Sequence, residues 1–141
     1  METLFGAGRG VIYLESAVDA LRAVDGSREE AITTSVEKFL DSPPSAFNKS
    51  VSAHVWQVRD LGTNTRAFAT WCQNETIDCE LCIVHYIYRK RNEKHAFDQL
   101  TAFDNEGESF QDRVSGMSQD RYESWKAQVE SEDTYRTEFT T

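Results

Sequence analysis

Apolar and polar positions along the chain first follow the spacing of a strand and then that of two helices. Residues 9–15 form a short β-rich apolar run. Residues 16–25 and 27–40 carry apolar side chains at helical spacing, which predicts two amphipathic helices, each capped by the serine at its start. Residues 41–44 include two prolines and end the second helix. The chain is therefore predicted to open with a strand and a helical hairpin whose apolar faces require a sheet to cover them.

From residue 51 the period of the apolar positions changes to two. Residues 51–59, 65–72 and 79–88 are predicted strands joined by short polar turns. The third of these is almost continuously apolar and aromatic, as expected for a central strand that is covered on both faces. Three consecutive strands with short turns predict an antiparallel meander.

The last third of the chain is predicted to be mainly helical. A short helix is expected around residues 96–103, followed by an acidic loop at 104–108 and a helix at 118–130. Residues 131–141 are expected to be frayed. The predicted fold class is α+β, with a small antiparallel β-sheet, an N-terminal helical hairpin packed on one face and an extra C-terminal helix.

The length and composition predict one compact cytoplasmic domain. The chain has 141 residues, and no apolar run approaches the roughly 20 residues of a membrane span. The first ten residues lack the basic start and apolar stretch of a signal peptide. Three cysteines are an odd number, so reduced thiols are expected and not a disulfide framework. We expect no membrane association.

Two motifs suggest a bound metal or nucleotide, but their context argues against both. Cys79-x-x-Cys82 has metal-ligand spacing, yet on an extended strand residues three apart point to opposite faces, which predicts core thiols. The glycines at 6, 8 and 10 precede a strand and lack the Lys-Ser/Thr of a phosphate-binding loop. We therefore expect no metal and no organic cofactor.

The formal net charge of −9 at first sight disfavours nucleic acid as a partner, because phosphate binding depends mainly on Lys and Arg. The charge is uneven, however, since residues 47–97 hold 7 basic and 5 acidic side chains, whereas residues 1–46 and 98–141 are acidic. The acidic balance also resembles that of halophilic proteins from salt-rich cytoplasm, although an acidic tail alone would produce it. An anionic ligand is therefore expected at the middle third.

The densest basic stretch, residues 89–95, follows the end of the predicted central strand. Arg59 and Arg66 bracket the preceding hairpin turn, so both are candidates to join this stretch on one concave face. The alternative is that these cations are solvated strand ends, paired with nearby acids such as Asp60, Glu80 or Glu93.

Four short motifs follow one another along the chain: Phe47-x-Lys49, Val55-Trp56-Gln57-Val58-Arg59, Arg66-Ala67-Phe68 and Ile83-Val84-His85-Tyr86-Ile87-Tyr88-Arg89-Lys90-Arg91. Their order and separation resemble those of the RelE/ParE superfamily of type II toxins, especially its HigB-like branch. The resemblance covers about residues 11–100. It implies a RelE-like toxin domain at 1–103, followed by an acidic extension at 104–141.

The resemblance also implies a function. Such toxins are endoribonucleases that cut mRNA, commonly at the ribosome, without a metal ion, and a cognate antitoxin protein neutralises them. The ribose 2′-hydroxyl attacks the adjacent phosphate, so the enzyme must move protons and stabilise charge on the phosphoryl group. By motif position, the expected catalytic residues are Arg66 and Arg91, which would stabilise the phosphate. His95 is the third expected catalytic residue, as general acid or base, because imidazole titrates near neutrality. The expected RNA-binding residues are Arg59, Arg89, Lys90 and Lys94, with Arg89 also an alternative to Arg91.

One departure from the family pattern affects proton transfer. Many members carry a tyrosine after the basic strand end, where this chain has Phe97. The hydroxyl of Tyr86, Tyr88 or Tyr122 could replace it. His85 lies between apolar residues of the central strand and is predicted to sit within the sheet and not in the site.

The sequence leaves two alternatives to an RNA-cleaving enzyme. One is a ParE-like inhibitor of DNA gyrase, which needs no proton-transfer group. The other is a catalytically silent interaction module, in which the acidic C-terminal helix packs over the basic residues.

Overall fold

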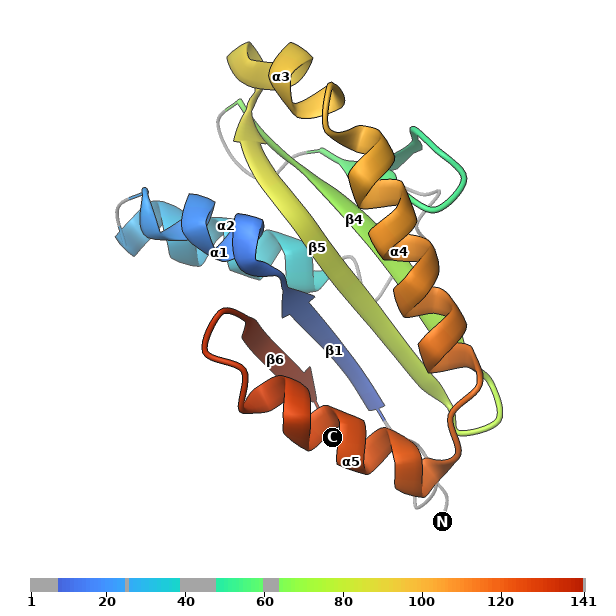
Figure 1. The fold of residues 1–141 in the computed structure, drawn as a ribbon. Helices are drawn as coiled ribbons and strands as arrows, with labels where there is room; N and C mark the ends of the chain where they lie inside the picture. The colour runs from blue at the N-terminus through green and yellow to red at the C-terminus, as the bar shows by residue number, and fades with distance from the viewer. Residues whose placement is uncertain (1–7, 25, 39–47, 60–63, 141) are drawn as a thin grey trace.

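The computed structural model describes residues 8–24, 26–38, 48–59 and 64–140. They form one β-sheet with helices on both faces, so the predicted α+β class is confirmed (Figure 1). The strands are β1 (Gly8–Tyr13), β2 (Asn48–Ser50), β3 (Trp56–Val58), β4 (Thr65–Asn74), β5 (Cys79–Arg89) and β6 (Arg136–Thr140). The helices are α1 (Glu15–Arg22), α2 (Gly26–Lys38), the 3₁₀ turn η4 (Lys90–Asn92), α3 (Glu93–Phe97), α4 (Leu100–Ser115) and α5 (Gln119–Glu130). None of the described helices is long and apolar enough to cross a membrane.

The sheet is mixed and not wholly antiparallel as predicted. Its strand order is β2-β3-β4-β5-β1-β6, and β1 pairs parallel with β5, whereas the other neighbours are antiparallel. The predicted meander is confirmed for β3, β4 and β5, with β5 inside the sheet. The prediction did not place β1 beside β5 because the two paired strands are about 70 residues apart in the chain.

The N-terminal helices confirm the predicted hairpin. Leu14 occupies the N-cap position of α1, so the expected cap at Ser16 is wrong. Ser27 lies inside α2, which begins at Gly26, so the expected cap at Ser27 is also wrong. Residues 39–47, which include the two prolines predicted to end this helix, lie outside the described residues. Leu21 of α1 and Ile32 of α2 are buried against β1, β4 and β5.

The C-terminal third departs most from prediction. The expected acidic loop at 104–108 is part of α4, which lies across β4, and the predicted domain boundary after residue 103 falls inside that helix (Figure 1). The expected frayed end contains β6, which pairs with β1. An ion pair between Arg136 of β6 and Glu29 of α2, at 3.0 Å, also holds β6 in place. The predicted helix at 118–130 is confirmed as α5, with Ser118 capping its start.

Cys79 and Cys82 project from opposite faces of β5, as predicted. Cys82 packs under α1 and α2, whereas Cys79 and Cys72 pack with α5 on the other face. All three thiols are free and buried. Burial raises the pKa of Cys72 to about 12 and also raises the pKa of Cys79 and Cys82.

These thiols are therefore expected to be inert in the folded protein, because the thiolate is the reactive form. Iodoacetamide at neutral pH should label none of them within the time that labels all three in urea, as measured by intact-mass spectrometry. Rapid labelling of the native protein at Cys72 or Cys82 would contradict this packing.

A candidate cationic site at the ends of β4 and β5

The candidate site lies where β4 begins and β5 ends. Arg66 is paired across the two strands with Tyr88, so both side chains project from the same face. On that face the Arg66 guanidinium Nη1 binds the Glu93 carboxylate Oε2. Glu93 is the first residue of α3, which follows β5 after one 3₁₀ turn. The tight connection places the carboxylate over the strand end.

A buried amide joins these groups into one cluster. Gln57 of β3 is 2% exposed, and its Nε2 donates to the Tyr88 hydroxyl at 2.8 Å and to Glu93 Oε2 at 3.0 Å. Its Oε1 accepts from Arg59 Nε at 3.3 Å. We call Gln57, Arg66, Tyr88 and Glu93 the Arg66 cluster. Because Gln57 is bonded on both sides, it fixes the relative positions of the other members.

The phenol of the Arg66 cluster is held in its protonated form. Tyr88 is 5% exposed, and burial raises its pKa, an effect that the Gln57 hydrogen bond opposes. Of the three candidate tyrosines, Tyr88 is the one whose hydroxyl is hydrogen-bonded within this cluster. Tyr86 stacks on Tyr88, with ring centroids 6.1 Å apart, and Tyr122 packs with Trp125 in the core beside α5.

A second group of cations surrounds the end of β5. Asn64, Arg89, Lys90 and Arg91 line a pocket of about 530 Å³. The backbone N–H of Lys90 donates to the Asn64 carbonyl at 2.7 Å, which ties the start of η4 to the turn before β4. All four residues are exposed, so the charges of Arg89, Lys90 and Arg91 are accessible to an anionic ligand. We call this the cationic pocket.

The predicted basic residues do not all share one face. Arg89 pairs with Thr65, the neighbour of Arg66, so Arg89 and Arg66 project from opposite faces at the same end of the sheet. Arg66 and its neighbour Arg59, which binds Gln57, form one group at the Arg66 cluster. The second group lines the cationic pocket and consists of Arg89, Lys90 and Arg91. The two groups meet at the strand end and are not spread over one concave surface.

Lys94 and His95 lie on α3 and are exposed. His95 is two residues after Glu93, and positions two apart on a helix do not face each other. Among the described residues, no hydrogen bond or ion pair joins His95 to Arg66 or Arg91. The structure therefore does not bring the three predicted catalytic residues into contact.

Sequence reasoning treated Glu93 only as a neutralising partner and did not consider Gln57. A signal for Gln57 is present, since a glutamine lies inside a strand between two apolar residues. No comparable signal marks Glu93, because an acid at the start of a helix is common. Phe97, which replaces the expected tyrosine, is 36% exposed and packs edge-on against Phe68, with ring centroids 5.2 Å apart.

A buried group of polar side chains joins α4 to the sheet. His85 is fully buried within β5, as predicted, with Nδ1 2.7 Å from Glu106 Oε1 and Nε2 2.7 Å from Thr70 Oγ1. The Thr70 hydroxyl donates to the His54 carbonyl at 2.7 Å, so it accepts from His85. This Thr-His-Glu arrangement resembles a hydrolase triad, but the hydroxyl is fully buried. It therefore holds α4 on the sheet and does not act as a nucleophile.

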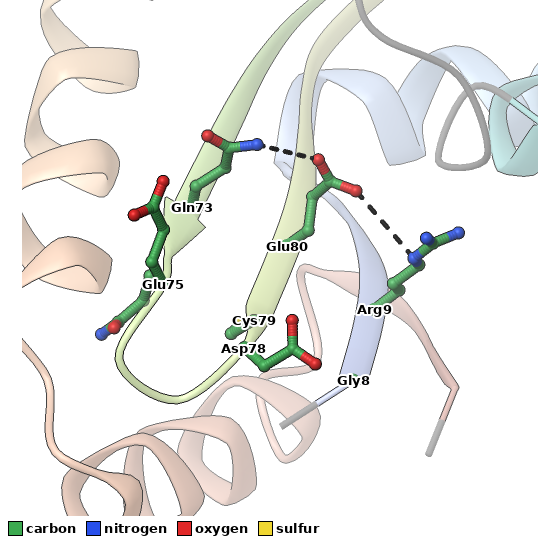
Figure 2. A pocket seen from close by; sticks show the side chains of 8 residues that line it. Gly8, Arg9, Gln73, Glu75, Asp78, Cys79 and Glu80 are labelled. Carbon is green, nitrogen blue, oxygen red and sulfur yellow. Dashed lines mark hydrogen bonds and ion pairs between the residues drawn. The ribbon is translucent and has the colours of Figure 1, made fainter. Parts of the chain in front are cut away.

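The opposite end of the sheet is acidic. A pocket of about 260 Å³ there is lined by Gly8, Arg9, Gln73, Asn74, Glu75, Asp78, Cys79 and Glu80. Figure 2 shows Glu80 between Gln73, at 3.0 Å, and Arg9, at 3.9 Å. Three carboxylates against one guanidinium do not favour a phosphate ligand.

Helix α5 packs at this acidic end and not at the basic one. Its buried residues share a core cluster with Ile77, in the turn before β5, and with Cys79, the first residue of β5, whereas α3 follows the end of β5 (Figure 1). The expectation that the C-terminal helix covers the basic residues is therefore wrong. The Arg66 cluster and the cationic pocket both lie at the end of the sheet away from α5.

Comparison with known proteins gives one likeness, in a solved structure. No family model matches this chain, and no curated protein matches it. Among solved structures, the isolated RelE toxin of E. coli, in a P21 crystal form, is similar with a TM-score of 0.40. The two chains are 15% identical, and the match covers 64% of this chain and 96% of that one. A likeness at this level carries no argument about function.

Proposed function

We propose that this protein is the toxin of a type II toxin–antitoxin pair and cleaves mRNA at the ribosome without a metal ion. The observation that carries the proposal is the Arg66 cluster beside the cationic pocket at one end of the sheet. A partly exposed guanidinium next to a carboxylate, with three further cations nearby, suits a reaction at an RNA phosphate. The sequence resemblance to HigB-like toxins supplies the reaction class.

In this proposal the residues divide the work between binding and chemistry. The Arg66 guanidinium contacts the scissile phosphate and stabilises its developing charge. Arg89, Lys90 and Arg91 bind neighbouring phosphates of the RNA backbone. Lys94 extends the positive surface along α3, and a proton-transfer role for the neighbouring His95 stays a prediction. A cognate antitoxin would neutralise the protein by covering this end of the sheet.

Expression tests the proposal directly. Production of the chain in a bacterial host is expected to arrest growth, and co-expression of the neighbouring open reading frame is expected to restore it. Primer extension on translated messages should then reveal new 5′ ends linked to codon positions. The Arg121→Ala variant, which alters an exposed arginine of α5 at the opposite end, should remain as toxic as the parent chain.

Two results would reject RNA cleavage. DNA breaks without new RNA ends would favour a ParE-like gyrase inhibitor. Normal growth, with intact messages and a folded protein in the cell, would favour a catalytically silent module.

A further inference from the structure

We infer that Glu93 is the general base of the proposed RNA cleavage, taking the proton from the attacking ribose 2′-hydroxyl. The inference rests on that proposed function. It assigns to a carboxylate on α3 the role of base, for which the sequence offered His95.

The position of Glu93 beside Arg66 is the first ground. A general base must lie within hydrogen-bond reach of the hydroxyl whose proton it takes. That hydroxyl is adjacent to the phosphate it attacks, so a base beside the phosphate-binding guanidinium is well placed. Of the described carboxylates, Glu93 is the one that contacts Arg66, and its side chain is 35% exposed.

The hydrogen bonds of Glu93 are the second ground, because they occupy one carboxylate oxygen. Oε2 accepts from Arg66 Nη1 and from Gln57 Nε2. No described donor contacts Oε1. Oε2 is thus held by the protein, and Oε1 is left to accept a proton from substrate.

The other candidates near the guanidinium are less suited to this role. Burial raises the pKa of Tyr88, so the phenol keeps its proton at neutral pH and cannot act as the base. His95 lies on a different side of α3 from Glu93. Phe97 has no group that can accept a proton.

The step balances without a further reactant. Glu93 Oε1 accepts the 2′-hydroxyl proton while the 2′-oxygen forms a bond to phosphorus. The bond from phosphorus to the 5′-oxygen breaks, and that oxygen takes a proton from solvent. The products are a 2′,3′-cyclic phosphate and a 5′-hydroxyl end, and Glu93 then releases its proton to water.

The test compares Glu93→Gln and Glu93→Ala with the parent chain on ribosomes programmed with a labelled message. Glu93→Gln keeps an oxygen for Arg66 and Gln57 but removes the base, so cleavage should fall by about 10²–10⁴-fold. Binding of single-stranded RNA should be unchanged or tighter, because a negative charge beside Arg66 is lost. In Glu93→Ala, added formate should restore part of the cleavage by replacing the missing carboxylate. Glu80→Gln, at the acidic end, is the matched control and should cleave normally.

The formate experiment compares cleavage by the same Glu93→Ala protein with and without formate. A folding defect cannot imitate a gain of cleavage on adding formate. Parental cleavage by Glu93→Gln would overturn the inference and leave the proposed function intact. So would a loss in Glu93→Ala that formate does not reverse. Absence of cleavage by the parent chain itself would instead reject the proposed function and the inference with it.

Discussion

An Arg66→Ala variant is expected to cleave mRNA about 10²–10³-fold more slowly than the parent chain. That is the typical cost of removing one donor that stabilises transition-state charge. Here the loss also leaves the Glu93 carboxylate bound only by Gln57, so the phosphate would meet an uncompensated negative charge. Single-turnover cleavage on programmed ribosomes measures the effect, with toxicity on expression as a second readout.

Stability should change little in this variant. The Arg66 and Glu93 side chains are 21% and 35% exposed, and ion pairs near the surface contribute about 0–1 kcal/mol. Arg121→Ala serves as the control and should cleave normally.

Arg91→Ala should weaken RNA binding and reduce its salt dependence, since Arg91 lines the cationic pocket and does not contact the Arg66 cluster. Full cleavage by Arg66→Ala, in a protein that is folded, would show that the site is misassigned.

A Gly107→Ala variant is expected to lose up to about 2 kcal/mol of unfolding free energy. Gly107 lies on the buried side of α4, where an added Cβ would be 2.3 Å from Thr70 Oγ1 and 3.3 Å from the His54 carbonyl oxygen. Thr70 cannot turn away without breaking its bonds to His54 and His85. Overpacking of this kind costs about 1–3 kcal/mol, which exceeds the roughly 1 kcal/mol that alanine contributes to a helix over glycine.

Gly116→Ala is the matched control for this substitution. Its added Cβ would have Asp112 O as its nearest neighbour, at 3.7 Å, and φ at Gly116 is −97°, which suits alanine. Its melting temperature should equal or slightly exceed that of the parent chain. Urea unfolding followed by circular dichroism compares the three proteins. Equal stability of Gly107→Ala and the parent would show that α4 lies further from β4 than these distances require.

Local patterns predicted the elements that depend on few distant contacts. The strand at residues 8–13, the helix ending near residue 130 and the meander follow from spacing and turn residues within short windows. The acidic segment at 104–108 was predicted as a loop because its composition is polar and contains a glycine. It is helical because Asp104 accepts from His54 N at 2.8 Å and Gly107 packs on Thr70, contacts that link residues about 40–50 apart.

The candidate site shows the same division. The basic run after the central strand and the choice of Arg66 as a candidate came from the order of residues along the chain. The order of residues did not show which side chains share a face of the sheet, because β5 contains a bulge at His85. Phe68 pairs with Tyr86, but the next residue of β4, Ala69, pairs with Val84. Beyond a bulge the alternation of faces is reversed. This reversal places Tyr88 with Arg66 and turns Arg89 to the other face.

By itself, the sequence determined that a basic strand end would exist in an acidic chain, since charge and period are properties of neighbouring residues. Only the tertiary structure decided which cations share a face and that a carboxylate on α3 would bind Arg66. The physical reason is that both outcomes depend on strand register and on contacts between residues distant in the chain. A shift of one residue in the register exchanges the two faces of a strand, and the composition stays the same.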